Sequence, residues 1–223
     1  MNQLTLVIGN KNYSSWSLRP WLLLSYFNIP FTEVRIPLYR EDTSESLSQW
    51  SPSGLVPVLK HGDFAVWDSL AICEYLQDLY PDYSLWPNDI KARAVARSVS
   101  AEMHSGFMAL RSSMPMNCCR SFPGKGLNKE SSADIQRVTT IWRECREQYG
   151  EGGSLLFGEF TIADAMYAPV GQRFRTYGVQ LDEVSEAYVS AILSLPAMKE
   201  WISSAKAEEE IIQEFEPYRN ETT

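Results

Sequence analysis

The chain has 223 residues, of which 44% are hydrophobic and 22% charged, the balance of a folded globular protein that can bury a sizeable core. Twenty basic against 28 acidic residues give a net charge of −8, which disfavours nucleic acid and anionic membrane surfaces as partners. The chain opens without a basic leader and has no apolar run near the roughly 20 residues of a membrane helix, so we expect a cytoplasmic protein.

Cysteine and motif patterns exclude further classes. The four cysteines show neither a CxxC nor a metal-ligand spacing, and Cys118 and Cys119 are adjacent, so we expect reduced, mostly buried thiols and no metal. No G-x-S-x-G, Walker or H-E-x-x-H pattern occurs, which disfavours a hydrolase, a nucleoside triphosphatase and a metalloprotease.

The first part of the chain predicts a β-α-β unit. Leu4–Ile8 is a short apolar run ended by glycine, which predicts a strand buried on both faces. From Leu18, apolar residues recur at helical spacing until Asn28 and Pro30 end the pattern. Phe31–Leu38 predicts a second strand, which a right-handed crossover places parallel to the first.

A hairpin and a helix complete this region. Val56–Lys60 and Phe64–Trp67 are strand-like runs joined by a His-Gly-Asp turn, and Ser69–Tyr80 has the apolar spacing of an amphipathic helix. We therefore predict an α/β domain with a mixed four-stranded sheet in residues 1–80.

After a turn-rich connector the strand signals disappear. Helical periodicity occurs in the segments 90–117, 131–149, 162–177 and 186–206. We predict an all-α domain in residues 90–215, with the acidic run Glu208–Glu210 as a solvated face or tail. Thr161 and Asp164 have the spacing of a capping box, for which we predict a structural role.

The stretch NYSSWSLRPW carries three serines before Pro20. Proline is tolerated in the first turn of a helix, so we expect the N-cap at Ser17 or later. Ser14 and Ser15 then lie in front of a helix N-terminus, whose unpaired N–H groups favour an anion. The alternative is that these serines only shape and cap the loop.

Two further features favour a bound ligand. Pro57 stands at the start of a predicted strand, where a cis Val56–Pro57 bond would leave the Val56 backbone free to pair with an extended peptide. Asp68 and Ser69 open the following helix, and this second N-terminus suits a carboxylate.

Four motifs in order resemble one protein family. The segments SSWSLRPW, SPSGLVPVL, DSLAICEYL and FGEFTIADAMYAPV span nearly the whole chain and resemble the cytosolic glutathione S-transferases, most closely the serine-type, zeta-like and related bacterial branches. The resemblance implies the glutathione transferase fold, in which a thioredoxin-like α/β domain precedes an all-α domain. It also implies a homodimer that binds glutathione as co-substrate, without a metal, and conjugates it to small hydrophobic electrophiles.

The resemblance gives the paired serines a role. Ser14 matches the serine that donates a hydrogen bond to the glutathione sulfur and holds it as thiolate, and Ser15 is expected in the same glutathione site. Tyr13 is a rival donor, because a phenol has an ordinary pKa of only about 10. The resemblance alone favours Ser14.

The rest of the glutathione site follows from the same resemblance. Val56, followed by Pro57, matches the residue whose backbone pairs with the cysteinyl unit of glutathione. Asp68 and Ser69 match the acidic residue and serine that hold its γ-glutamyl end.

Trp16 stands where zeta members carry a cysteine. This departure counts against the maleylacetoacetate isomerase activity of the zeta branch. It also disfavours omega-like or glutaredoxin-like activity, because disulfide exchange needs a cysteine in this loop. Two alternatives to conjugation remain. One is a glutathione-dependent cis-trans isomerase of the maleylacetoacetate type, and the other is a non-catalytic binding or regulatory protein that keeps the fold.

One helix face is expected to border the electrophile. The predicted wall of this substrate pocket consists of Tyr13, Trp16, His104, Phe107, Met108 and Arg111. The last four are spaced i, i+3, i+4 and i+7, the spacing of one helical face. Arg111 suits a carboxylate of the substrate or the glycine end of glutathione, whereas His104 has the alternative interpretation of a partly buried structural histidine.

Overall fold

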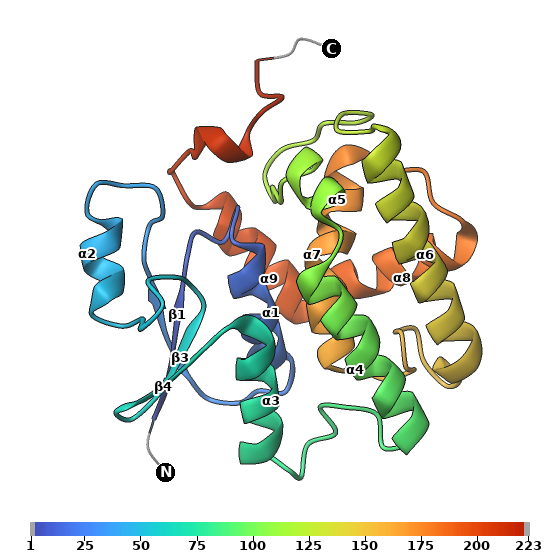
Figure 1. Ribbon diagram of the computed structural model, residues 1–223, viewed down its shortest axis with the longest axis horizontal. Helices are drawn as coiled ribbons and strands as arrows, with labels where there is room; N and C mark the ends of the chain where they lie inside the picture. The colour runs from blue at the N-terminus through green and yellow to red at the C-terminus, as the bar shows by residue number, and fades with distance from the viewer. Residues whose placement is uncertain (1–2, 221–223) are drawn as a thin grey trace.

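The computed structural model describes residues 3–220, and Figure 1 shows a sheet region beside a larger group of helices. In chain order the elements are β1 (Leu4–Ile8), α1 (Ser15–Tyr26), β2 (Thr32–Arg35), α2 (Thr43–Ser48), β3 (Val58–His61), β4 (Phe64–Trp67), α3 (Ser69–Leu79), α4 (Ile90–Ser105), α5 (Met108–Ser113), α6 (Lys129–Tyr149), α7 (Ile162–Tyr177), α8 (Glu183–Ser194), α9 (Pro196–Lys206) and the 3-10 turn η1 (Gln213–Phe215).

The four strands form one mixed sheet in the order β2-β1-β3-β4. β1 and β2 are parallel, with Val7 opposite Val34, whereas β3 is antiparallel to both of its neighbours. The predicted β-α-β unit, hairpin and mixed sheet are therefore confirmed. β2 is shorter than the predicted run, because Pro37 has no N–H to extend the ladder.

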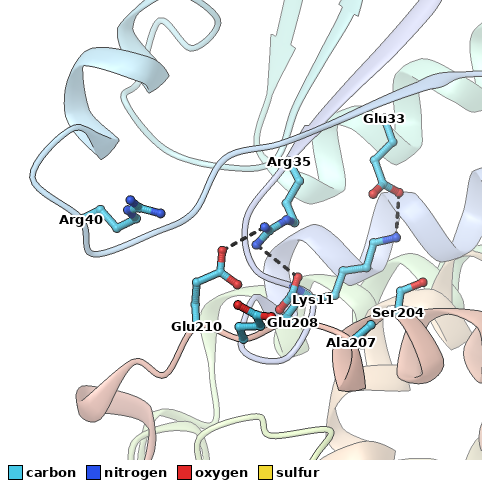
Figure 2. Close-up of a pocket in the computed structure, with 9 residues that line it drawn as sticks. Lys11, Glu33, Arg35, Arg40, Ser204, Ala207, Glu208 and Glu210 are labelled. Atoms are coloured by element: carbon cyan, nitrogen blue, oxygen red, sulfur yellow. Dashed lines mark hydrogen bonds and ion pairs between the residues drawn. The ribbon is translucent and has the colours of Figure 1, made fainter.

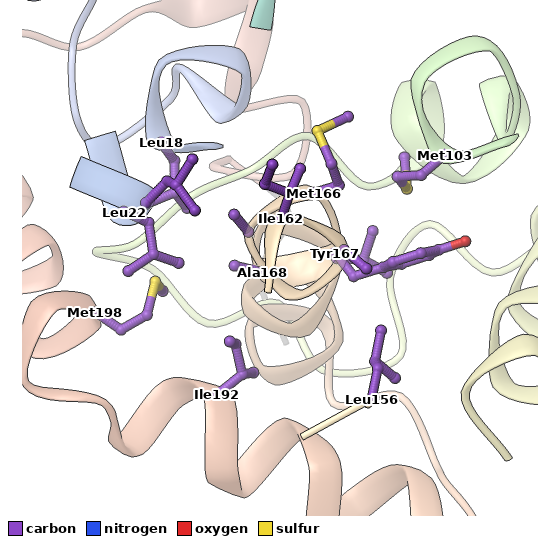
Figure 3. Packing of buried hydrophobic residues seen from close by; sticks show 14 of the residues in the cluster. Leu18, Leu22, Met103, Leu156, Ile162, Met166, Tyr167, Ala168, Ile192 and Met198 are labelled. Atoms are coloured by element: carbon purple, nitrogen blue, oxygen red, sulfur yellow. The ribbon is translucent and has the colours of Figure 1, made fainter. Parts of the chain in front are cut away.

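Helix α7 is the centre of the helical region. All of its residues except Arg175 are buried. Figure 3 shows Leu18 of α1, Met103 of α4 and Ile192 of α8 directed at the residues of α7. Because α1 of the sheet region packs on α7, one apolar core extends through both halves. Loops at this junction are thereby held in fixed positions.

Two predicted helical segments are each broken into two helices. The segment 90–117 breaks after Ser105, where a Cβ on Gly106 would lie 2.7 Å from the carbonyl oxygen of Glu102. Phe107 follows with a φ of 57° and is only 7% exposed, so burial of its ring offsets the cost of a left-handed backbone. The segment 186–206 breaks before Pro196, which begins α9 because it has no N–H to continue α8.

The capping box before α7 is confirmed. The carboxylate of Asp164 accepts hydrogen bonds from the N–H and the hydroxyl of Thr161, at 2.9 and 3.1 Å, and from the N–H of Leu156 at 3.0 Å. Asp164 is fully buried. It therefore joins the start of α7 to the preceding turn.

The structure also bears on the cysteines, on possible membrane helices, on possible metal sites and on strands outside the sheet. All four cysteines are free thiols, and only Cys119 is exposed. Across residues 3–220, no helix is long and apolar enough to cross a membrane, and no cluster of three metal-ligating side chains is found. Outside the sheet, the same residues form two isolated bridges in the turn at 155–159.

Candidate active site

A cavity of about 750 Å³ opens in front of the N-terminus of α1. Its walls come from the loop before α1, from α2 and the loop after it, from α5 and α7, and from the C-terminal segment, which we define as residues 208–216. The predicted site residues that line it are Tyr13, Ser14, Ser15, Trp16, Val56, Met108 and Arg111. The predicted residues outside its lining are Pro57, Asp68, Ser69, His104 and Phe107.

Ser14 is the N-cap of α1, so the prediction of a cap at Ser17 or later is wrong. The Ser14 oxygen accepts from the N–H of Ser17 at 3.4 Å, and the Ser14 carbonyl accepts from the N–H of Leu18 at 3.2 Å. Pro20 consequently lies inside the helix. The helix starts early because the Ser17 hydroxyl also accepts from the N–H of Gly9 at 3.1 Å, which fixes the first turn to the end of β1.

The hydrogen of the Ser14 hydroxyl is free to change direction. Ser14 donates to the Ser17 oxygen at 2.7 Å. Hydroxyl groups rotate, and either oxygen of such a pair can be the donor. When Ser17 donates instead, Ser14 can direct its hydrogen at an acceptor in the cavity.

The hydroxyl of Tyr13, in contrast, is already hydrogen-bonded within the protein. Its hydroxyl donates to a carboxylate oxygen of Glu216 at 2.7 Å, and its ring stacks on Phe215 with centroids 5.9 Å apart. Burial, followed by the hydrogen bond to Glu216, raises the pKa of Tyr13 well above its ordinary value. Tyr13 therefore lines the cavity as a neutral phenol whose hydroxyl hydrogen is donated to Glu216 and not to the cavity.

Three arginines lie around the paired serines. Arg173 donates to the Ser15 hydroxyl at 3.2 Å, and the guanidinium groups of Arg19 and Arg111 lie 4.0 and 4.7 Å from the Trp16 ring centroid. Burial, and then the charge of Arg111, lowers the pKa of Arg173 to about 10. The pKa of Arg19 is lowered by burial and then by the other two arginines.

None of these three arginines forms an ion pair with a carboxylate within 4 Å in the part of the chain that the structure describes. Arg19 instead donates to the carbonyl of Met166, and Arg173 donates to the carbonyls of Met114 and Pro169. This cluster of positive charge, without a directly paired carboxylate among the described residues, makes the start of α1 favourable for an anion.

The Val56–Pro57 peptide bond is cis, as predicted. Val56 lines the cavity, and Pro57 precedes β3. The backbone of Val56 does not belong to a strand. It also takes part in none of the backbone hydrogen bonds of loops and turns among the described residues, so its N–H and C=O can pair with a ligand in the cavity.

Asp68 and Ser69 begin α3. Asp68 has a φ of 75° and accepts from the N–H groups of Leu70 and Ala71 at 2.9 and 3.2 Å. Ser69 is buried, and its hydroxyl has no hydrogen-bond partner among the described residues. The second carboxylate oxygen of Asp68 lies 2.6 Å from Nε2 of His104.

The predicted single face of His104, Phe107, Met108 and Arg111 does not exist, because the break at Gly106 separates them. Phe107 belongs to the core rather than to the cavity wall. His104 contacts Asp68 and packs edge-on against Trp16. Met108 and Arg111, on α5, are the two that reach the cavity.

The C-terminal segment is the part of the site that the sequence did not reveal. Figure 2 shows Arg35 between Glu208 and Glu210, in a second cleft of about 660 Å³. Glu208 also accepts from the N–H groups of Lys11 and Asn12 at 2.7 and 3.1 Å. The interpretation of Glu208–Glu210 as a solvated tail is therefore wrong for Glu208 and Glu210.

These contacts direct the chain toward the cavity. Beyond the ion pairs, Glu214 and Phe215 line the cavity, and Phe215 also packs edge-on against Tyr39. Tyr39 and Arg173 were not predicted either. The only available signal was a phenylalanine and a tyrosine among charged residues near position 216, which does not identify their partners.

Comparisons with known proteins show the family. Residues 13–79 match the family model "Glutathione S-transferase, N-terminal domain", and residues 128–203 match "Glutathione S-transferase, C-terminal domain". A probable maleylacetoacetate isomerase of Caenorhabditis elegans is 32% identical over 159 residues, which is 70% of this chain and 74% of that protein. Glutathione S-transferase Z2 of Arabidopsis thaliana is 27% identical over 71% of this chain and 75% of its own length.

Solved structures give the same fold. A glutathione transferase homologue from Burkholderia, solved with bound glutathione, superposes with a TM-score of 0.71 at 22% identity and covers 92% of this chain and 100% of its own. The two family models together cover more than half of the chain, in the order in which the sheet region and the helical region occur. The chain is therefore a member of the glutathione S-transferase family.

Proposed function

We propose that this glutathione transferase conjugates the glutathione thiolate to small hydrophobic electrophiles, a detoxification reaction. The observation that carries the proposal is the Ser14 hydroxyl at the N-terminus of α1, beside arginines that form no ion pair with a carboxylate of the described residues. A hydroxyl donor, a helix N-terminus and nearby positive charge each stabilise a thiolate relative to a thiol. The thiol proton goes to solvent, and the sulfur then forms a bond to the electrophilic carbon. In the same reaction halide leaves an aryl halide, the C–O bond of an epoxide opens, or the electron pair of an enone double bond moves toward its carbonyl oxygen. The alkoxide or enolate that results takes a proton from water.

The same proposal places the three units of the peptide. Ser14 holds the sulfur, with Ser15 beside it, and the free backbone of Val56 pairs with the cysteinyl unit. Asp68 and Ser69 hold the γ-glutamyl ammonium and carboxylate, because the carboxylate of Asp68 attracts the first and the N-terminus of α3 the second.

Calorimetric titration with glutathione, followed by turnover with a panel of neutral electrophiles, tests this function. We expect saturable binding and a glutathione-dependent product with an aryl halide, an epoxide or an enone. Absence of binding at millimolar glutathione would refute the proposal. Binding without turnover of any electrophile would favour the non-catalytic alternative.

A glutathione-dependent isomerase is a second candidate. Arg111 and Arg173 both line the cavity, and such cations suit a substrate that carries a carboxylate. The Caenorhabditis elegans relative is described as a probable maleylacetoacetate isomerase. Isomerisation of an acidic enone without net consumption of glutathione would distinguish this activity from conjugation.

We propose residues 1–80 as the glutathione-binding domain and residues 90–215 as the domain that contributes the electrophile pocket; residues 1 and 2 lie outside the described part of the chain. These limits are supported by the end of α3 at Leu79 and the start of α4 at Ile90, with no helix or strand in the described residues between them. We also propose a cytoplasmic location, which the four free cysteines support.

Ser69→Ala should weaken glutathione binding and leave the fold intact. The Ser69 hydroxyl has no hydrogen-bond partner among the described residues, so its removal should not destabilise α3. Loss of a hydrogen bond to the charged γ-glutamyl end should cost about 1 kcal/mol or more, roughly a five-fold rise in Kd. Titration calorimetry measures this, with thermal unfolding as the control. An unchanged Kd in the folded variant would remove Ser69 from the site.

The protein should be a homodimer. β4 is an edge strand, and its Phe64 and Trp67 are 58% and 49% exposed, which supports a covered face in solution. Light scattering should therefore give about twice the 25.4 kDa of one chain. A mass of one chain across micromolar concentrations would contradict this.

A further inference from the structure

The pair of Asp68 and His104 joins the two halves of the molecule at one end of the proposed glutathione site. Asp68 begins α3, and His104 lies in the last turn of α4. Their side chains are 42% and 32% exposed, and the joined atoms are 2.6 Å apart. The pair is therefore accessible to solvent and to a ligand.

The carboxylate of Asp68 is already oriented without His104. A carboxylate has about four acceptor positions. Two on Oδ1 are taken by the N–H groups of Leu70 and Ala71, and one on Oδ2 by His104. One position on Oδ2 remains for a ligand. Since α3 fixes the orientation, the effect of His104 on that position is chiefly electrostatic.

The charge at this position depends on the protonation of His104. A carboxylate accepts, so Nε2 carries a hydrogen in both states of the ring. The second proton binds Nδ1, which has no hydrogen-bond partner among residues 3–220. Neutral His104 leaves Asp68 its negative charge. Protonated His104 cancels that charge and places a cation beside the open acceptor.

Three other ionisable groups of the described residues act on the pair or lie beside Trp16 next to it, and each keeps one charge state through the pH range of interest. They are Arg19 on α1, Cys73 on α3 and Arg111 on α5. Arginine stays charged in proteins, and burial raises the pKa of Cys73 far above its ordinary value, which keeps the thiol neutral.

Asp68 itself stays ionised. Partial burial raises its pKa, but the hydrogen bonds from His104 and Ala71 outweigh that effect, and the net pKa lies below the ordinary value. Among the described groups at this end of the site, His104 belongs to the residue type whose charge ordinarily changes near neutral pH.

We propose that His104 acts through Asp68 and makes the hold of that carboxylate on the glutathione ammonium depend on pH. Neutral His104 supports the binding of the ammonium, and protonated His104 competes with it for the same carboxylate. The inference rests on the proposed function, because it takes Asp68 as the partner of that ammonium.

The test uses S-methylglutathione, whose sulfur cannot ionise and so adds no pH dependence of its own. We expect its Kd for the wild-type protein to rise about five-fold or more between pH 8 and pH 5.5, since two cations a few ångströms apart at a protein surface repel to this degree. An analogue that lacks the α-amino group should bind with a Kd that is independent of pH.

Two variants assign the effect. His104→Gln keeps a neutral N–H donor near the Nε2 position, so its Kd at pH 8 should match the wild type while the rise at pH 5.5 disappears. The chain has only two histidines. His61, which contacts Tyr75 on α3 at 2.7 Å, provides the matched control, and His61→Gln should keep the full pH dependence.

A measurement on the wild-type protein supports the variants. Linkage is reciprocal, so saturating S-methylglutathione should lower the titration midpoint of the His104 ring by about 0.7 pH unit or more in nuclear magnetic resonance spectra, and leave that of His61 in place. This result does not depend on whether His104→Gln folds.

Different outcomes would refute the role of His104 and the proposed glutathione transferase function. A pH-independent Kd in the wild type, a pH dependence that survives in folded His104→Gln, or an unmoved His104 midpoint would each overturn the inference alone. Failure of glutathione and S-methylglutathione to bind at pH 8 would instead refute the proposed function.

Discussion

Ser14→Ala should raise the pKa of the bound glutathione thiol by about one to two units, because a hydrogen bond to a charged group contributes roughly 1.5–3 kcal/mol. The bond is made to the thiolate and not equally to the thiol, so turnover near neutral pH should fall about ten-fold or more. The ultraviolet absorbance of the bound thiolate, followed against pH, measures the shift. Glutathione affinity at low pH, where the bound thiol is neutral in both proteins, should change little.

Tyr13→Phe is the matched control for this prediction. Its hydroxyl donates to Glu216, so its removal should leave the thiolate titration nearly unchanged. A large shift in Tyr13→Phe with none in Ser14→Ala would transfer the role of donor to Tyr13. Since Ser14 also caps α1, a loss of about 1 kcal/mol in unfolding free energy is expected with Ser14→Ala, and both variants need that measurement.

Asp164→Ala should lower the free energy of unfolding by about 3–5 kcal/mol. The substitution leaves the N–H groups of Leu156 and Thr161 without their acceptor inside the protein, and buried unpaired donors are among the costliest defects. Denaturant unfolding measures the loss. A decrease of less than 1 kcal/mol would show that water or a neighbouring group replaces the carboxylate.

The effect of Asp164 should also depend on pH. Burial raises its pKa from 3.8 to about 6, so the folded state holds this proton more tightly than the unfolded chain does. The contribution of Asp164 to stability is then greatest below about pH 4 and declines as the pH rises to about 6, by about 3 kcal/mol for a shift of this size. The stability difference between wild type and Asp164→Ala should therefore be larger at pH 4.5 than at pH 7, and parallel curves would contradict this assignment.

The sequence was sufficient for the features that are local. The β-α-β unit, the hairpin and the capping box depend on residues a few positions apart, and their patterns predict them. The motifs around Ser14, Val56 and Asp68 were found through the resemblance to one family rather than through periodicity. Five of the predicted residues nonetheless lie outside the cavity lining.

The wrong predictions concern features that depend on contacts between residues far apart in the sequence, which a local pattern cannot indicate. Helical spacing continues across Gly106 and Phe107, yet the core takes up the Phe107 ring and turns the chain there. The early start of α1 depends on the N–H of Gly9, at the end of a strand. The partners of Glu208 and Glu216 are about 200 positions away, so composition near the C-terminus could not distinguish an anchored segment from a solvated one.

The bond between Tyr13 and Glu216 has a consequence for how the protein is made. These residues are 203 positions apart, so the ribosome has synthesised the whole sheet region long before the last wall of the cavity exists. Domains tend to fold in the order of synthesis, so a sheet region that folds first leaves Tyr13 and the start of α1 without this wall until residues 208–216 are made.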